Sequence, residues 1–209
     1  MAVLSREAPI DPAHAALLII DVQNYCIKDE ARTTEYFRDS LRITVLPNIR
    51  RLQLACRRAG VEVVYSVIEN MTRDGRDRSL DYKISGIDVP RGSWEARVVG
   101  EIAPGEDEMV FCKTSSSVFI SSNIDYVLRN LAVRSLIVAG IMTDQCVESA
   151  VRDACDLGYL VTLVTDACTT SSDERHEQSL LGTRGYCRQC STEALLAEIA
   201  ALTNRDAQA

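Results

Sequence analysis

Short runs of apolar residues alternate along the chain with longer stretches in which apolar residues recur at helical spacing. An unbroken apolar run is typical of a strand buried on both faces of a sheet. Apolar residues spaced every three or four positions are typical of a helix that packs one face on its neighbours. The pattern predicts strands at residues 16–22, 61–67, 109–112, 135–139, 160–165 and 186–190. It predicts helices at residues 35–59, 122–131, 144–157, 173–181 and 191–202.

Capping residues support several of these boundaries. Gly60 and Gly158 directly follow predicted helices, where glycine readily takes the left-handed conformation that ends a helix. Ser191 stands at the start of the last helix, where its hydroxyl can accept a hydrogen bond from a free backbone amide. Pro47 interrupts the long pattern at residues 35–59, so we expect a break or a late helix start there.

The alternation of strands and helices predicts one α/β domain over residues 1–209. We expect a doubly wound, mostly parallel, six-stranded sheet with helices on both faces. Residues 69–104 show no regular pattern and are long for a connection in a compact domain, so we expect a loop-rich segment that governs specificity. Ligands of such folds bind at the carboxyl ends of the strands, where reactive side chains are therefore expected.

Composition and charge narrow the class of partner. The chain is 46% hydrophobic and 25% charged, which is typical of a globular protein. Its 30 acidic and 23 basic residues give a net charge of -7, which argues against a nucleic-acid partner. The first residues lack a secretory apolar segment, and the longest apolar run, residues 15–20, is too short to span a membrane. We therefore expect a cytoplasmic protein without a membrane partner, whose eight cysteines are free thiols.

Three reactive side chains stand at or just beyond predicted strand ends: Asp21, Lys113 and Cys146. We expect all three to project into one crevice. Cys146 falls in the first turn of the helix at residues 144–157, where the helix dipole and a nearby ammonium favour the nucleophilic thiolate. Each residue alone also has an ordinary interpretation: a turn-capping aspartate, a solvent-reaching lysine and a cysteine packed between helix and sheet.

Other common chemistries have little support in the sequence. The chain has two histidines, His14 and His176, and we expect both to be ordinary surface residues, so a nucleophile would need a carboxylate base. No glycine-rich phosphate-binding motif follows a strand, and we expect no cofactor. Cys187 and Cys190 form a single Cys-x-x-Cys pair, which is weak support for zinc or redox chemistry, and we expect no metal site.

Three ordered motifs resemble one known family. They are LIIDVQN at residues 18–24, KTSSSVF at residues 113–119 and VAGIMTDQCV at residues 138–147. With them, the chain is identified as a member of the isochorismatase-like cysteine hydrolases, which include nicotinamidases, N-carbamoylsarcosine amidases and ureidoacrylate amidohydrolases. The resemblance spans residues 15–196 and implies a Rossmann-like hydrolase fold in a homo-oligomer, a dimer or a tetramer.

The resemblance also implies a catalytic site. Its triad maps onto Asp21, Lys113 and Cys146, and a cis peptide bond maps onto Ile141–Met142. The backbone amides of Met142 and Cys146 would form an oxyanion hole. The implied reaction is cleavage of the C–N bond of a small amide or ureido substrate through a thioester on Cys146.

Departures from the family pattern narrow the choice of reaction. The nicotinamidase branch carries an Asp-x-His…His metal site, whereas residues 66–72 read SVIENMT without histidine, which argues against zinc and nicotinamide. The isochorismatase branch proper does not use the cysteine, so Cys146 favours amide chemistry. Hydrolysis of an enol ether and a catalytically silent binding or assembly subunit stay open as alternatives, and a redox role of Cys187 and Cys190 is weaker.

Further residues are candidates for substrate binding, although loop or packing roles are open for each of them. They combine hydrogen-bonding and aromatic side chains near the strand ends and in the loop-rich segment: Asn24, Tyr25, Glu69, Asn70, Trp94 and Phe119. Arg73, Arg76 and Arg78 could bind a substrate carboxylate, or could simply belong to a solvated loop. A contribution from a neighbouring subunit is also open.

Overall fold

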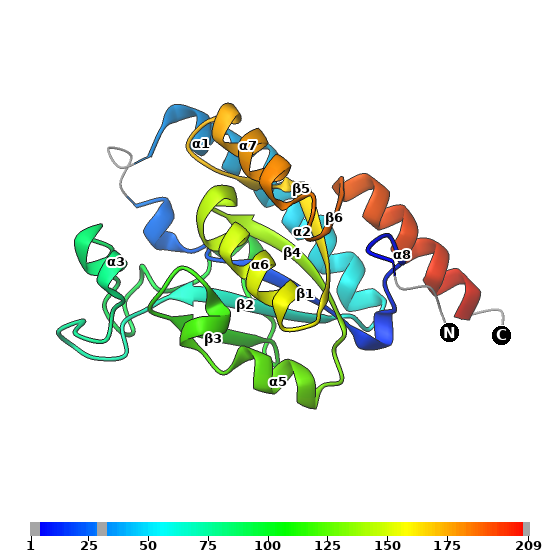
Figure 1. Cartoon of the computed structure of the whole chain (residues 1–209), viewed down its shortest axis with the longest axis horizontal. Helices are drawn as coiled ribbons and strands as arrows, with labels where there is room; N and C mark the ends of the chain where they lie inside the picture. The colour runs from blue at the N-terminus through cyan, green and yellow to red at the C-terminus, as the bar shows by residue number, and fades with distance from the viewer. Residues whose placement is uncertain (1–4, 29–32, 207–209) are drawn as a thin grey trace.

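The computed structural model describes residues 5–28 and 33–206, and its centre is a six-stranded sheet. All strand pairs are parallel, and the order across the sheet is β3-β2-β1-β4-β5-β6 (Figure 1). The strands are β1 (Ala15–Ile20), β2 (Glu62–Ile68), β3 (Met109–Lys113), β4 (Ser135–Ile141), β5 (Leu160–Thr169) and β6 (Arg188–Cys190). The predicted α/β class and the six predicted strands are confirmed.

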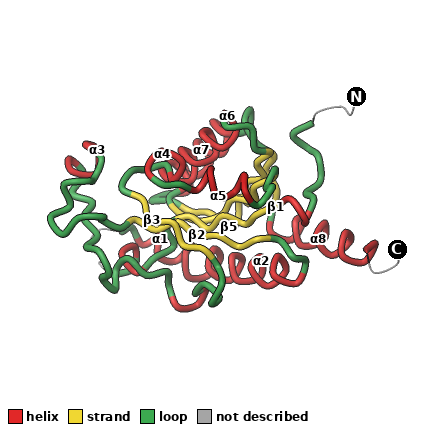
Figure 2. Tube along the Cα trace, turned by 90° about the horizontal axis from the view of Figure 1, so that it is seen from below, coloured by secondary structure: helices red, strands yellow, loops and turns green. Residues whose placement is uncertain are grey.

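Helices cover both faces of the sheet (Figure 2). One face carries α1 (Glu35–Ser40), α2 (Leu46–Arg58) and α8 (Thr192–Asp206). The other face carries α4 (Val118–Ser121), α5 (Ile124–Asn130), α6 (Glu148–Asp156) and α7 (Asp173–Thr183). Two apolar cores result, one on each face, which explains why β1 and β4 are buried along their whole length.

The helix predicted at residues 35–59 is continuous, but it changes its winding. A π-helical turn, Leu41–Val45, joins α1 to α2, and the N–H of Leu46 bonds to the carbonyl of Leu41. Pro47 is the second residue of α2, but helical winding already begins at Glu35, so neither a break nor a late start occurs at the proline. The wider turn ahead of the proline accommodates its ring and its missing N–H within the helix.

The strand order places a topological switch point between β1 and β4, because the chain continues from these two strands toward opposite edges of the sheet. Ile20, at the end of β1, is level with Ser66 of β2 and Gly140 of β4. The approach at Gly140 is close: a Cβ atom there would lie 2.2 Å from the carbonyl oxygen of Ile20, and the φ angle is +128°. Only glycine fits at this position.

The segment at residues 69–104 is loop-rich, as predicted, and it lies beside the carboxyl edge of the sheet (Figure 1). It contains the short helix α3 (Leu80–Ile84) and one 3₁₀ turn, Gly100–Ile102. Apolar residues of this segment form a small core of their own with the end of β2: Ile68, Tyr82, Val89 and Ala96. Among the described residues, no helix is long and apolar enough to cross a membrane.

Candidate active site

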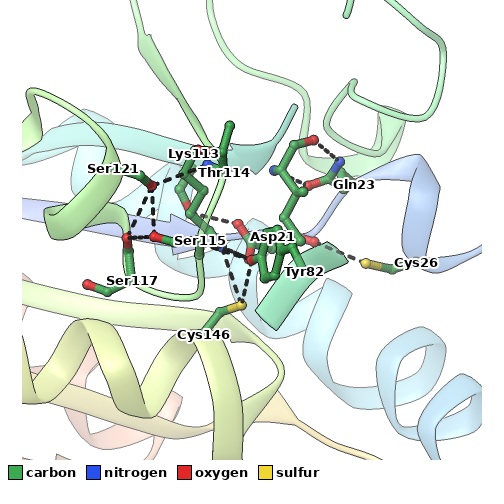
Figure 3. Close-up of polar contacts among 12 residues, drawn as sticks. Asp21, Gln23, Cys26, Tyr82, Lys113, Thr114, Ser115, Ser117, Ser121 and Cys146 are labelled. Carbon is green, nitrogen blue, oxygen red and sulfur yellow. Dashed lines mark hydrogen bonds and ion pairs between the residues drawn. The ribbon is translucent and has the colours of Figure 1, made fainter. Parts of the chain in front are cut away.

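Asp21, Lys113 and Cys146 meet at the carboxyl edge of the sheet, as the strand ends predict (Figure 3). Asp21 follows β1, Lys113 is the last residue of β3, and Cys146 lies in a π-helical turn, Thr143–Val147, between β4 and α6. Lys113 Nζ lies 2.9 Å from Asp21 Oδ2 and 3.3 Å from Cys146 Sγ. The exposed fractions are 2%, 0% and 6%, so the three groups interact with little screening by water.

The backbone conformation of Asp21 orients its carboxylate. Its φ angle is +55°, a left-handed conformation that aspartate tolerates better than most residues. The Asp21 N–H donates to the carbonyl of Ser66 at 3.0 Å, and the Ser66 hydroxyl donates to Asp21 Oδ1 at 2.9 Å. Oδ2 contacts Lys113 as an ion pair without hydrogen-bond alignment, which leaves this oxygen able to accept a proton.

Lys113 remains an ammonium although its side chain is buried. Burial alone lowers its pKa, but the negative charge of Asp21 and the Cys146 sulfur outweigh burial and raise the pKa above its ordinary value. The ammonium also donates to the Tyr82 hydroxyl and to the Ser115 carbonyl, both at 2.8 Å. A cation held this firmly can act as a permanent positive charge beside the sulfur.

Burial and charge at this site favour the protonated form of Cys146, whereas the helix position and the nearby ammonium pointed to the thiolate. Burial and the nearby Asp21 carboxylate raise the pKa of the Cys146 thiol to about 12, and Lys113 only partly opposes them. Transfer of the thiol proton to Asp21 would leave one negative and one positive charge in the buried cluster, as before. The site therefore favours deprotonation by an internal base over a standing thiolate.

Tyr82 belongs to the same cluster, and sequence reasoning missed it. Its side chain is 1% exposed, and its hydroxyl lies 2.9 Å from the Ser115 carbonyl and 3.7 Å from Cys146 Sγ. Lys113 Nζ lies 5.5 Å from the centre of the Tyr82 ring. Tyr82 comes from α3, in the segment without regular patterning, so no spacing in the sequence pointed to it.

The turn that carries Cys146 is held from α7. Thr143 Oγ1 lies 2.9 Å from His176 Nδ1, and the Ser179 hydroxyl donates to the Thr143 carbonyl at 3.1 Å. His176 is therefore half-buried and engaged, not an ordinary surface residue, and burial lowers its pKa. His14 is a surface residue, as predicted, and lies 2.8 Å from Asp11.

The Ile141–Met142 peptide bond is cis, as the resemblance implies. The Met142 carbonyl accepts the N–H groups of Gln145 and Val147, at 3.1 and 3.2 Å, on either side of Cys146 in the chain. Of the pair expected to form the oxyanion hole, Met142 directly precedes the π-helical turn and Cys146 lies within it, and both residues line the pocket described next.

A pocket of about 820 Å³ opens onto Asp21 and Cys146. Its apolar wall includes Phe37 and Ile141. Its charged lining consists of carboxylates, Asp21, Asp81 and Asp144, and contains no lysine or arginine among the described residues. Asp144 is paired with Arg175 and accepts from the Thr170 hydroxyl at 2.5 Å, so part of this negative charge is neutralised.

One of the six predicted substrate-binding residues, Tyr25, lines the pocket. The other five are not among the described residues that line it. Glu69 accepts from the Gly92 N–H at 2.6 Å and from Cys112 Sγ at 2.7 Å. The Asn70 amide donates to Asp88 at 2.6 Å. Both residues therefore fasten the loop-rich segment internally, which corrects the expectation that they face a substrate.

The remaining three predicted residues also support the structure around the pocket. The Asn24 amide donates to the Trp94 carbonyl at 3.0 Å, which ties the segment to the end of β1. The Trp94 side chain is 52% exposed and does not line the pocket. Phe119 packs beside Tyr159, with ring centroids 6.0 Å apart. These contacts correct the expectation of an aromatic wall formed by Trp94 and Phe119.

Arg76 and Arg78 of the loop-rich segment bind within the segment. Arg76 pairs with Asp74 at 3.2 Å, and Arg78 donates to the carbonyls of Gly75 and Ile87 at 2.9 and 2.8 Å. None of Arg73, Arg76 and Arg78 is among the described residues that line the pocket, so the structure does not offer them as a carboxylate clamp.

Cys187 and Cys190 of the Cys-x-x-Cys pair are not joined by a disulfide. All eight cysteines are free, and buried Cys187 contacts the Thr183 carbonyl at 3.5 Å. Within the described part of the chain, no three side chains of histidine, cysteine, aspartate or glutamate are grouped so that they could hold a metal ion.

Comparisons with known proteins identify the family of this chain. Residues 15–194 match the Isochorismatase domain family. A "probable inactive nicotinamidase" of Arabidopsis thaliana is 33% identical over 175 residues, which are 80% of this chain and 87% of that protein. The ureidoacrylate amidohydrolase RutB of Agrobacterium fabrum is 30% identical over 189 residues, with 80% of this chain and 82% of RutB covered.

Solved structures show the same fold. A cysteine hydrolase from Pseudomonas syringae pv. phaseolicola superposes with a TM-score of 0.83 at 24% identity, covering 96% of this chain and 99% of that one. The matched family domain includes Asp21, Lys113 and Cys146. The chain therefore belongs to the isochorismatase family of hydrolases.

Proposed function

We propose that this protein is a cysteine-dependent amidohydrolase that cleaves the C–N bond of a small amide or ureido compound. The observation that carries the proposal is the buried Lys113–Asp21 ion pair beside the thiol of Cys146, with Nζ 3.3 Å from Sγ. A base, a fixed cation and a nucleophile in contact are the parts that acyl transfer through a thioester requires.

The first half of the reaction forms the thioester. Asp21 accepts the thiol proton as the sulfur of Cys146 attacks the carbonyl carbon, and Lys113 stabilises the negative charge on sulfur. The backbone amides of Met142 and Cys146 bind the oxyanion of the tetrahedral intermediate. Asp21 then gives its proton to the leaving nitrogen, the C–N bond breaks, and ammonia or an amine departs.

The second half of the reaction regenerates the thiol. Asp21, now a carboxylate again, takes a proton from water as the water oxygen attacks the thioester carbon. The intermediate collapses with cleavage of the C–S bond, and the sulfur of Cys146 takes the proton back from Asp21. The products are the free acid and the resting enzyme, so the two halves consume one water molecule.

The pocket narrows the substrate class. RutB is named for ureidoacrylate, whose carboxylate needs a cationic partner when it leaves water. The described lining offers carboxylates and no lysine or arginine side chain. We therefore favour an amide or ureide whose remaining part is uncharged or cationic.

Ammonia release from a panel of primary amides and ureides tests the proposal. We expect turnover in the native protein, loss of turnover in Cys146→Ala, and a thioester mass on Cys146 in the rapidly quenched native reaction. Cys56→Ala is the matched control, because Cys56 is also a buried free thiol but lies in α2, away from the site. The proposal fails if no amide or ureide releases ammonia, or if Cys146→Ala retains the native rate.

A further inference from the structure

We infer that Tyr82 is a fourth catalytic residue, whose hydroxyl donates a hydrogen bond to the Cys146 sulfur when that sulfur loses its proton. The inference rests on the proposed hydrolysis and adds to the Asp21, Lys113 and Cys146 set a second donor for the sulfur, beside the Lys113 ammonium. Its starting point is the position of the Tyr82 hydroxyl, between Lys113 Nζ at 2.8 Å and Cys146 Sγ at 3.7 Å (Figure 3).

The ammonium of Lys113 has more neighbours than protons. Four groups surround its nitrogen: it donates to the Tyr82 hydroxyl and the Ser115 carbonyl at 2.8 Å and to Cys146 Sγ at 3.3 Å, and it forms an ion pair with Asp21 Oδ2 at 2.9 Å. All three ammonium protons are engaged, and two of them serve the closer oxygen atoms, so the sulfur receives one long hydrogen bond. The sulfur is the most distant of them, and a newly formed thiolate therefore benefits from a second donor.

The Tyr82 hydroxyl can be that donor. Its oxygen accepts a hydrogen bond from Lys113, which leaves the hydroxyl proton to be donated to the Ser115 carbonyl at 2.9 Å or to Cys146 Sγ. The neutral thiol is a weak acceptor, so the resting hydroxyl favours the carbonyl. Once Asp21 has taken the thiol proton, the charged sulfur becomes the stronger acceptor and the hydroxyl turns toward it.

The Tyr82 proton is shared in this step and not given up. Burial and the nearby sulfur and carboxylate raise the pKa of Tyr82, so the phenol stays protonated throughout the cycle. Tyr82 is therefore a hydrogen-bond donor that stabilises the thiolate, whereas Asp21 is the group that carries the proton.

The chain around Tyr82 holds the phenol in place. The Ser79 hydroxyl caps α3 by accepting the Tyr82 N–H at 3.2 Å, and the Ser79 N–H donates to the Thr114 carbonyl at 2.9 Å, beside Lys113 in the chain. In the same short helix, Leu80 and Ile84 are 73% and 77% exposed while Tyr82 is 1% exposed. Tyr82 is thus the buried anchor of α3, and its burial places a hydroxyl in the site.

Tyr82→Phe tests the inference, because it removes the hydroxyl and keeps the ring. Tyr65→Phe is the matched control: Tyr65 is also fully buried, and its hydroxyl contacts Gln53 at 2.6 Å and Glu108 at 2.8 Å. For Tyr82→Phe we expect kcat/KM to fall about 10- to 100-fold, mostly in kcat, since a hydrogen bond to a charged group is lost. Tyr65→Phe should retain native kcat/KM.

A second readout needs no substrate. The rate at which iodoacetamide alkylates Cys146, followed by peptide mass spectrometry, reports the thiolate fraction of this residue. We expect Tyr82→Phe to lower that rate about 10-fold at pH 8 and Tyr65→Phe to leave it unchanged. Wild-type alkylation and wild-type kcat in Tyr82→Phe would overturn the inference.

Two outcomes need separate treatment: a Tyr82→Phe variant that does not fold, and a native protein that releases no ammonia. If Tyr82→Phe does not fold, 3-fluorotyrosine placed at position 82 keeps the size and provides a stronger donor. We then expect alkylation of Cys146 at least as fast as in the native protein, and slower alkylation overturns the inference. If the native protein releases no ammonia from any amide, the proposed hydrolysis fails, whereas the alkylation comparison still decides the role of Tyr82.

Discussion

Asp21 and Lys113 form a buried ion pair, with 2.9 Å between Oδ2 and Nζ, although 92 residues separate them in the chain. The pair brings a base and a cation to one thiol without adding net charge to the interior. A buried charge that loses its partner is costly, so each group depends on the other. This dependence predicts coupled effects of substitution on stability and on catalysis.

Asp21→Asn removes the negative charge of the side chain and keeps nearly the same shape, so it tests the charge alone. Asparagine also tolerates the left-handed backbone at this position, so the fold should persist, but Lys113 loses its partner and Cys146 loses its base. We expect kcat to fall at least about 10²-fold and the free energy of unfolding to fall by about 3 kcal/mol. Steady-state kinetics and urea unfolding measure the two effects. Asp125→Asn, which breaks the Asp125–Arg129 surface pair, is the control, and native turnover in Asp21→Asn would exclude Asp21 as the base.

The pKa of Cys146 predicts the pH dependence of its alkylation. Because the pKa is raised to about 12, the thiolate fraction in the absence of substrate should grow about tenfold for each pH unit between pH 7 and pH 10. Rates of alkylation by iodoacetamide at this one residue, followed by peptide mass spectrometry, give the profile. A plateau below pH 8 would show a standing thiolate and contradict the prediction.

Gly140 should be the most sensitive glycine of the sheet. A Cβ atom in Gly140→Ala would lie 2.2 Å from the carbonyl oxygen and 2.6 Å from the nitrogen of Ile20, directly before Asp21. We expect the free energy of unfolding to fall by about 3–5 kcal/mol, with loss of activity.

The control for this substitution is Gly60→Ala. The φ angle of Gly60 is also positive, at +71°, but beyond its chain neighbours no atom would lie within 4 Å of an added Cβ atom, so we expect a cost of about 1 kcal/mol. Urea unfolding compares the two variants. Equal stability of both would show that the β1–β4 contact tolerates a methyl group.

The carboxylate-lined pocket predicts a preference among ureides of equal length. Propylurea should be hydrolysed with a kcat/KM at least about 10-fold higher than 3-ureidopropionate, because the described lining offers no cation to the carboxylate. Asp81→Lys should reduce or reverse this ratio, since Asp81 lines the pocket from α3. Asp107→Lys, in an exposed loop, is the control. Preference of the native protein for the carboxylate would contradict the prediction.

Much of the architecture could be predicted because it depends on local patterns. Unbroken apolar runs identified the strands, since a strand covered on both faces has no polar position to alternate with. Parallel strands bring their carboxyl ends to one edge, so Asp21, Lys113 and Cys146 could be expected together from their places in the chain. The only sign of Ser66 in the sequence was its place as the serine of the otherwise hydrophobic stretch VVYSVI at residues 63–68.

The contacts of the loop-rich segment could not be predicted, because they depend on how that segment folds back on the sheet. Tyr82 reaches the triad from a five-residue helix without a repeating pattern, while Glu69 and Asn70 turn away to bind Gly92 and Asp88. The direction of the Cys146 pKa shift could not be predicted for a related reason. The position of Cys146 at the start of a helix suggested a thiolate, but burial and the nearby Asp21 raise its pKa. Neither the burial of a side chain nor its distance from a residue far along the chain can be read from the sequence.

The sequence by itself determined the α/β class, the six strands and the three residues that meet at their ends, because hydrophobic periodicity and strand direction are properties of short segments. The tertiary structure alone decided in which direction the pKa of the Cys146 thiol shifts, which tyrosine joins the site and what charge lines the pocket. These properties follow from burial and from distances between segments far apart in the chain, since Coulomb interactions and desolvation depend on positions in space.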